Sequence, residues 1–273
     1  MENPIRNFQE VIQKLQSPKS VKEVLEEQIN IAIKSHQRSN FALLLSAFGA
    51  GLEVGFSVFL MGVIYTLFQD SFTEHTLHFF LAFAYPIGFI FVIIGKSELF
   101  TEHTTLAILP VFNNGVTLKA LAKLWGLIYA GNLIGGYFFG LIVTAVGPEM
   151  GSIDLKAFEY LAKKMVAHNW WIIIASGILA GWLMGLLSWL IASSQDTISR
   201  IVVVIIVTTV IGLGGLHHSI VGSIEVFAGL ISSKAITLSD YMVFQVCATL
   251  GNAIGGVVFV STIKYSHINA AEK

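Results

Sequence analysis

The chain has 273 residues, of which 55% are hydrophobic and 12% are charged, and its formal net charge is -1. Soluble domains carry about 25% charged residues, so this composition, with a mean hydropathy of +0.75, excludes an ordinary soluble protein and favours a membrane protein. The nearly neutral charge gives no sign of a nucleic-acid partner, and a single cysteine excludes a disulfide within the chain.

The first 40 residues are polar and predict an amphipathic helical segment rather than a membrane span. Apolar residues recur at helical spacing from Phe8 to Leu15 and again from Val21 to Ile33, with Pro18 between the two parts. We expect residues 1–40 to be cytoplasmic and to lie on the membrane or on a neighbouring subunit. The segment lacks the early apolar core of a cleavable signal peptide, and we expect none.

Residues 41–265 predict a channel domain of six transmembrane helices, followed by a short cytoplasmic tail at 266–273. Each complete span approaches the ~20 apolar residues that cross a bilayer as a helix. The predicted spans are 41–68, 77–94 with a shorter apolar piece at 104–112, 120–146, 169–193, 201–213 with a second piece at 220–232, and 241–264.

The distribution of lysine and arginine predicts the orientation. With both termini in the cytoplasm, the inner side carries Lys and Arg at 6, 14, 19, 22, 34, 38, 119, 123, 200, 264 and 273, against only 156, 163, 164 and 234 outside. This bias favours cytoplasmic termini in a multi-pass protein of the inner or plasma membrane.

An internal repeat predicts the architecture. The hexapeptide GNLIGG at 131–136 returns as GNAIGG at 251–256, 120 residues later, and Ser46 and Gly51 in the first span match Ser176 and Gly181 in the fourth. Two halves of three spans each, 41–146 and 169–264, must have opposite topology because three is odd. We therefore expect the inverted repeat found in channels and secondary transporters.

The second and fifth spans are each interrupted by glycine and polar residues. The interruptions read IGKSELFTEHTT and GGLHHSIVGS. Backbone at membrane depth must be covered by protein or line a water-filled cavity, so we expect two broken helices whose ends meet near the midplane. Applying the offset of 120 residues places Glu98 opposite His218 and Thr101 opposite Val221.

The interruptions resemble motifs of the formate/nitrite transporter family. SELFT at 97–101, GLHHSIVGS at 214–222 and the two GN motifs carry the resemblance, which covers about 38–265. It implies an aquaporin-like, all-α fold, a homopentamer with a pore in each protomer, and no cofactor. The implied substrates are small monovalent anions of weak acids, such as formate or nitrite.

The resemblance also implies roles for individual residues. His218 matches the central pore histidine and Thr101 the threonine beside it, while Leu99 and Phe100 match a hydrophobic constriction. Lys164, with Lys163 as the other candidate, matches a lysine that draws anions into a vestibule. The sequence departs from the family in having glycines at Gly181 and Gly222, where asparagines are common, and titratable groups at Glu102, His103 and Glu225.

Several of these side chains have a structural alternative. His218 is expected to line the pore or to hydrogen-bond the opposite interruption. His217 is a further candidate pore group, but adjacent residues on a helix point about 100° apart, so the two histidines cannot both face one pore. The Glu98 carboxylate is expected either to accept backbone N–H bonds at the interruption or to pair with His218.

Three further intramembrane groups leave alternatives open. Asn132 and Asn252 are expected to bind neighbouring helices or to contact the substrate. Glu53 in the first span is expected to be protonated, paired at an interface or part of a proton path. Glu102, His103 and Glu225 can form a titratable cluster only if the fold brings them together.

The expected function is permeation of a weak acid, with small anions and protons as the transported partners. A naked anion is costly in a narrow apolar constriction, and His218 can supply either a proton or a strong hydrogen-bond donor. The alternative is a cation or ammonium channel that uses the intramembrane carboxylates. An enzyme is not expected, because the sequence contains neither HExxH nor GxSxG, and no metal site is predicted.

Overall fold

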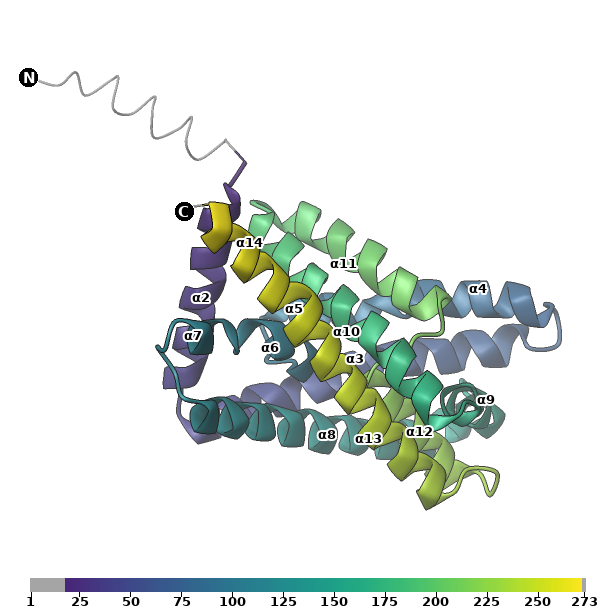
Figure 1. The fold of residues 1–273 in the computed structure, drawn as a ribbon. Helices are drawn as coiled ribbons and strands as arrows, with labels where there is room; N and C mark the ends of the chain where they lie inside the picture. Colours follow the sequence, from purple (N-terminus) through teal and green to yellow (C-terminus); the bar gives the residue numbers. More distant parts are fainter. Residues whose placement is uncertain (1–17, 272–273) are drawn as a thin grey trace, which may run out of the picture.

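The computed structural model describes residues 18–271, and every regular element in that part of the chain is a helix (Figure 1). The expectation of an all-helical membrane protein is confirmed, whereas the positions from Phe8 to Leu15 lie outside the described residues. The elements are α2 (Val21–Gln37), α3 (Asn40–Phe68), α4 (Glu74–Ala84), α5 (Pro86–Gly95), α6 (Phe100–Leu106), α7 (Leu109–Phe112), α8 (Leu118–Glu149), α9 (Leu155–Val166), α10 (Trp170–Ser193), α11 (Thr197–Leu213), α12 (Val221–Ser232), α13 (Leu238–Ile254), a π-helix (Gly255–Thr262) and α14 (Ile263–Ala271).

Within the described residues, five helical stretches are long and apolar enough to cross a membrane. They are Asn40–Phe68, Glu74–Gly95, Leu118–Glu149, Trp170–Ser193 and Leu238–His267. Helices α11 and α12 are apolar but shorter. Pro86 is tolerated within the second stretch because it occupies the first turn of α5, where a backbone N–H has no helical partner.

The chain leaves helical geometry at two places between apolar helices. Helix α5 ends at Gly95 and α6 begins at Phe100, while α11 ends at Leu213 and α12 begins at Val221. Lys96 (φ 60°) and Gly215 (φ 59°) adopt the left-handed conformation just after the two ends. A left-handed lysine is uncommon, so the first turn is held in a conformation that its sequence disfavours.

Two helix pairs have the same close packing. Helices α3 and α8 lie side by side, as do α10 and α13 (Figure 1). A Cβ atom at Gly51 would lie 2.2 Å from the carbonyl oxygen of Asn132, and a Cβ atom at Gly181 would lie 2.2 Å from that of Asn252. Each pair therefore needs glycine where the backbones touch.

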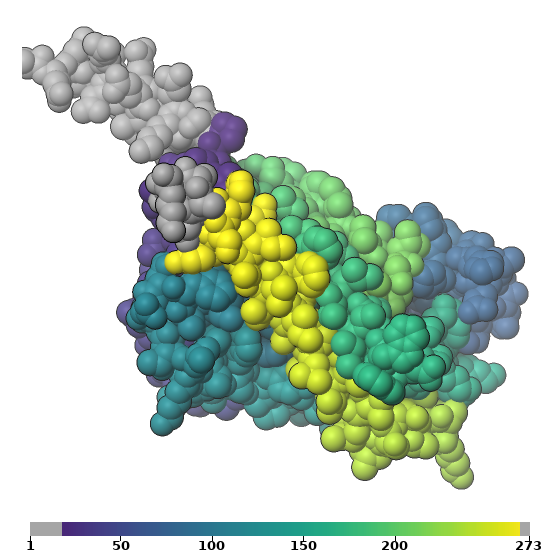
Figure 2. Space-filling view, in the orientation of Figure 1, coloured from purple at the N-terminus to yellow at the C-terminus, as the bar shows by residue number. Residues whose placement is uncertain are grey.

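Three features differ from the sequence-based expectation. Helix α9 lies in a stretch that we did not predict to be helical, and its buried positions Ala157, Phe158, Leu161 and Ala162 form an apolar face. The π-helix interrupts the last span, and Figure 2 shows α13 and α14 forming a diagonal band across one face. Helix α2 packs against α6, α7 and α10 of its own chain.

Candidate functional site

Asn132 of α8 holds the first interruption. Its Oδ1 accepts a hydrogen bond from the backbone N–H of Phe100 at 2.8 Å, and its Nδ2 donates to the carbonyl oxygens of Ala47 at 2.8 Å and Glu98 at 2.9 Å. One fully buried side chain thereby satisfies an N–H and a carbonyl of the interruption, which no helix hydrogen-bonds, and joins them to a carbonyl of α3.

Asn252 of α13 holds the second interruption in the same way. Its Oδ1 accepts from the backbone N–H of Ser219 at 2.8 Å, and its Nδ2 donates to the carbonyl oxygens of Gly177 and His217, each at 2.9 Å. Both amide hydrogens of each asparagine are used in these contacts. Asn132 and Asn252 therefore bind neighbouring helices, the first of the two roles expected for them.

The matching hydrogen bonds correct the expected pairing of the two interruptions. The backbone N–H of Glu98 donates to Ser46 Oγ at 3.3 Å, and that of His217 donates to Ser176 Oγ at 3.1 Å. Glu98 therefore corresponds to His217 and not to His218. The reason is one extra residue in the second half, where 35 positions separate His217 from Asn252 and 34 separate Glu98 from Asn132.

A hydrogen bond of 2.9 Å joins Thr101 Oγ1 to His218 Nε2, and both residues are fully buried. The backbone N–H groups of Ile220 and Val221 both point at His218 Nδ1, at 3.3 Å. Because Nδ1 accepts from these donors, it carries no proton, and Nε2 is the N–H that donates to Thr101. The imidazole is therefore neutral in this arrangement, with its ring packed edge-on against Phe89 at 5.2 Å.

A cavity of about 530 Å³ lies under helix α2, and we call it the α2 cavity. Helix α2 contributes Gln28 and Ser35, among others, to its lining. Titratable groups that line it are Glu27, Lys96, Glu98, Glu102, His103 and Arg200.

The Glu98 carboxylate has partners that the sequence did not indicate. It forms ion pairs with Arg38, which caps the end of α2, and with His103 of α6. Ser35 Oγ lies 3.5 Å from the same carboxylate. Glu98 thus ties the first interruption to α2, and it neither pairs with His218 nor accepts the backbone bonds that we expected.

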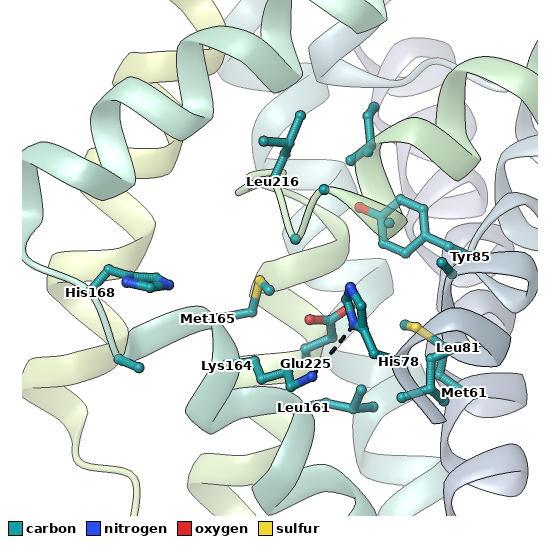
Figure 3. A pocket seen from close by; sticks show the side chains of 16 residues that line it. Met61, His78, Leu81, Tyr85, Leu161, Lys164, Met165, His168, Leu216 and Glu225 are labelled. Atoms are coloured by element: carbon teal, nitrogen blue, oxygen red, sulfur yellow. Dashed lines mark hydrogen bonds between the residues drawn. The ribbon is translucent and has the colours of Figure 1, made fainter. Parts of the chain in front are cut away.

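A second cavity, of about 300 Å³, lies between α4, α9 and α12, and we call it the α9 cavity (Figure 3). Its polar side chains are His78, Tyr85, Lys164, His168 and Glu225. Lys163 points elsewhere and pairs with Glu159 at 2.5 Å, so Lys164 is the lysine at this cavity.

Lys164 is held at the cavity wall by several contacts. Its Nζ lies 3.8 Å from the Glu74 carboxylate, 3.5 Å from His78 Nδ1 and 4.7 Å from the centre of the Tyr160 ring. Burial lowers the pKa of Lys164 below its ordinary value, and the neighbouring Glu74 opposes this shift. The ammonium group is therefore partly desolvated, which strengthens its attraction for an anion.

The Thr101–His218 pair lies between the two cavities. Tyr85 lines the α9 cavity and Val92 lines the α2 cavity, while Phe89, between them in sequence, contacts His218. Seven helical residues span about 10 Å, so the pair sits roughly one turn from each cavity. Neither Thr101 nor His218 lines the α2 cavity or the α9 cavity, and both are fully buried between the two.

The remaining candidates fall into distinct places. Glu102 and His103 line the α2 cavity whereas Glu225 lines the α9 cavity, so these three do not form one cluster. His217 bonds Ser176 Oγ through Nδ1 at 2.8 Å and the Met165 carbonyl through Nε2 at 3.1 Å, which ties α9 to α10.

The two apolar candidates of the first interruption are buried. Leu99 is fully buried just before α6, and the ring of Phe100 packs 4.9 Å from that of Tyr129 on α8. Neither lines the α2 cavity or the α9 cavity. Among the described residues, no group of three or more His, Cys, Asp or Glu side chains has a geometry that would hold a metal ion.

Comparison with known proteins assigns the family. The profile of the formate/nitrite transporter family matches residues 22–266. The chain belongs to the formate/nitrite transporter family. Inner membrane protein YfdC of Escherichia coli (strain K12) is 30% identical over 243 residues, which are 86% of this chain and 74% of YfdC. The nitrite transporter NirC of Salmonella typhimurium (strain LT2) is 26% identical over 216 residues, 77% of each chain.

Solved structures share the fold. A chain described as an FNT family ion channel superimposes with a TM-score of 0.80 at 22% identity, covering 90% of this chain and 99% of that one. A pentameric formate channel with formate bound superimposes with a TM-score of 0.70 at 21% identity, covering 85% and 98%.

Relative to the formate/nitrite transporter motifs named above, the two glycine substitutions are explained by packing. The Gly181 backbone touches α13, and a Cβ atom at Gly222 would lie 2.4 Å from the ring of Phe244. Sequence analysis missed Tyr85, Phe89, His78 and His168. Tyr85, Phe89 and His78 lie within the predicted span 77–94 and His168 lies just before the span 169–193, so no local pattern marks them.

Proposed function

We propose that this protein is a membrane channel or transporter for small monovalent anions of weak acids, such as formate or nitrite. Membership in the formate/nitrite transporter family supports this class of substrate. The observation that carries the proposal is the buried Thr101–His218 hydrogen bond between two cavities, one of which contains Lys164.

The proposed architecture has six transmembrane segments in two inverted repeats, with α5–α6 and α11–α12 as broken helices. The equivalent hydrogen bonds of Asn132 and Asn252 support this repeat. The lysine and arginine distribution supports cytoplasmic termini, which puts the α2 cavity inside and the α9 cavity outside. The likeness to a pentameric formate channel supports a homopentamer.

In the proposed pathway, Lys164 attracts the anion and the Thr101–His218 pair receives it. A desolvated anion needs donors to replace its water, and His218 Nε2–H can turn from Thr101 toward it. The Thr101 hydroxyl, which accepts the His218 bond, keeps its own hydrogen as a second donor. A hydrogen bond to a charged group contributes about 1.5–3 kcal/mol.

We propose that His218 acts as a neutral donor rather than as the source of a transferred proton. If Nε2 gave up its proton, Nδ1 would have to be protonated in turn. Nδ1 faces the N–H groups of Ile220 and Val221, so a proton there would meet two like donors. The donor role requires no such rearrangement.

The proposal is tested by uptake in proteoliposomes for wild type and His218→Asn. Loss of the imidazole donor should slow formate and nitrite uptake about tenfold or more, with the shape of the pH profile retained. The neighbouring His217→Asn is the matched control and should leave uptake close to wild type, because His217 bonds Ser176 and Met165 instead. Unchanged uptake in His218→Asn would contradict the proposal.

The same panel separates the alternative substrate class. Ammonium and methylammonium are measured beside the anions under identical gradients. Saturable ammonium flux without anion flux in wild type would replace the anion proposal with a cation channel. A pH profile that flattens only in His218→Asn would instead assign the proton transfer to the histidine.

A further inference from the structure

Glu225 is a buried carboxylic acid that the pathway described so far does not use. It is 3% exposed on α12, and it lines the α9 cavity. Within the described part of the chain its carboxylate makes no hydrogen bond and no ion pair. Figure 3 shows the group pointing into the cavity beside His78 and Lys164.

The titratable and charged groups that face Glu225 come from three other elements. Helix α4 contributes His78 and, at the rim, Glu74; Tyr85 lies between α4 and α5; Lys164 and His168 come from α9 and the segment after it. His78 Nε2 donates to the Leu213 carbonyl at 2.9 Å, so Nδ1 faces Lys164 as an acceptor. His78 therefore has no proton to give toward the cavity.

Burial makes an unpaired carboxylate costly in its charged form and favours the neutral acid. An anion drawn in by Lys164 would be repelled by an ionised Glu225 but can accept a hydrogen bond from the protonated group. The same cavity thus contains an ammonium group that attracts an anion and an acid that can protonate it.

Glu225 also lies on the way to the central pair. His218 lies three residues before α12 begins at Val221, and Glu225 is in the second turn of that helix. The backbone N–H of Gly222 donates to the His218 carbonyl at 2.9 Å, so α12 runs from the segment that contains His218 to the cavity that Glu225 lines.

We propose that the α9 cavity binds one small weak-acid anion on Lys164 and that Glu225 protonates it before it reaches His218, so that the Thr101–His218 pair hydrogen-bonds the neutral acid in place of the anion. This inference rests on the proposed function, and it names a different residue from His218 as the proton source. The substrate class is a carboxylate or an oxyanion of similar acidity.

The step is a proton transfer between two acids. The O–H bond of neutral Glu225 breaks, and its proton bonds to an oxygen of the anion, which leaves Glu225 as a carboxylate and the substrate as a neutral acid. The neutral acid crosses the apolar stretch at much lower cost than the anion. Glu225 then takes a proton from water in the cavity mouth, so one proton enters with each substrate.

The test compares Glu225→Gln with wild type in proteoliposomes loaded with a pH indicator, using labelled formate at outer pH 5 to 8 and protein-free liposomes as blanks. Wild type should take up formate and acidify the lumen in a 1:1 ratio. In Glu225→Gln, uptake at pH 7 should fall on the order of 100-fold, the range that a positioned acid contributes. The residual uptake should follow free formic acid and rise about tenfold per unit of falling pH.

Two further variants keep the test specific. Glu225→Asp retains an acid and should keep the wild-type pH profile at a reduced rate. Glu53→Gln removes another carboxyl group at membrane depth, on α3 and outside both cavities, and should behave as wild type. Size-exclusion profiles establish that each variant is assembled.

The outcomes separate this proposal from the one on which it rests. If Glu225→Gln matches wild type in rate and pH profile while His218→Asn is slow, the proton relay is overturned and the anion pathway stands. Equal losses in Glu225→Asp and Glu225→Gln, or the same loss and the same pH dependence in Glu53→Gln, would also overturn it. Absence of anion flux in wild type overturns both.

Discussion

At the scale of single residues, two asparagines fix the shape of the candidate site. Each hydrogen-bonds one N–H and one carbonyl of an interruption that a continuous helix would pair, and one carbonyl of a neighbouring helix. Each does so from a helix that is itself unbroken at that point. The side chains of Thr101 and His218 belong to the segments that these asparagines hold. The position of the central pair therefore depends on residues that do not touch it.

We expect Asn132→Ala and Asn252→Ala to destabilise the protein by similar amounts, because each leaves one buried N–H and two carbonyl groups without this partner. Unsatisfied buried groups cost about 1–3 kcal/mol each, so the free energy of unfolding should fall by about 2 kcal/mol or more. The measurement is a thermal melt in detergent. The fraction of protein that stays monodisperse is recorded against temperature, and a lower Tm reports the loss of stability.

Asn40→Ala is the control for these two variants. Asn40 is exposed at the start of α3, and surface changes of this kind stay within about 0.5 kcal/mol. A wild-type Tm in Asn132→Ala, or a drop as large in Asn40→Ala, would mean that the interruptions are held by other contacts.

At the scale of elements, helix α2 is the one that joins the polar N-terminal segment to the candidate site. Val24, Leu25 and Ala32 are buried against the helical body, and Ser20 and Glu23 form a capping box at its start. At its other end Arg38 pairs with Glu98 in the first interruption. The α2 cavity is thus closed by a helix whose end is fixed to the interruption by one ion pair.

We expect Arg38→Ala to loosen the first interruption without unfolding the protein. The Glu98 carboxylate keeps His103 and the weak contact with Ser35 as partners but loses its ion pair with the end of α2, so peptides covering residues 96–103 should exchange amide hydrogens faster. Hydrogen exchange with mass spectrometry measures this, and Arg38→Lys should restore part of the protection. Lys34→Ala, an exposed position on the same helix, should change nothing, and equal exchange in Arg38→Ala and wild type would rule out the link.

The elements also set the limit of what could be predicted from the sequence. Long apolar stretches predicted the bounds of the long helices to within a few residues, since burial in lipid requires a length and a composition that are visible in one dimension. The shorter piece expected at 104–112 is instead two helices, α6 and α7, and α6 begins already at Phe100. The equivalence of the two interruptions was predicted one residue out of register, because a single extra residue between the interruption and the GN motif has no local signal. Helix α9 was missed because its apolar face is short.

The candidate site was only partly predictable for a similar physical reason. Motifs identified Thr101 and His218, which lie within polar interruptions of apolar sequence. The partners of Glu98 come from positions 60 residues before it and five after it, and sequence spacing does not say which of them is in contact. Likewise, Tyr85 reaches the α9 cavity and Phe89 contacts His218 only because of how α4 and α5 pack in the fold.

At the scale of the whole molecule, every group of the proposed pathway comes from one chain. Both cavities, the Thr101–His218 pair and Glu225 are complete within the described residues of a single protomer. Many large apolar side chains remain exposed, for example Phe41, Phe138, Trp170 and Ile198, as expected for surfaces that face lipid or other subunits. Assembly would then cover apolar surface without adding a residue to the pathway.

This arrangement predicts that the protomers of a homopentamer work independently. Five copies of a 29.8 kDa chain form a particle of about 149 kDa, which native mass spectrometry can identify. Co-expression of wild type with His218→Asn under two affinity tags gives mixed pentamers whose composition the same spectra report. Because each pathway lies inside one chain, formate uptake should fall in direct proportion to the fraction of wild-type subunits. A steeper fall, in which one mutant subunit silences its neighbours, would mean that the pathway or its control crosses the subunit boundary.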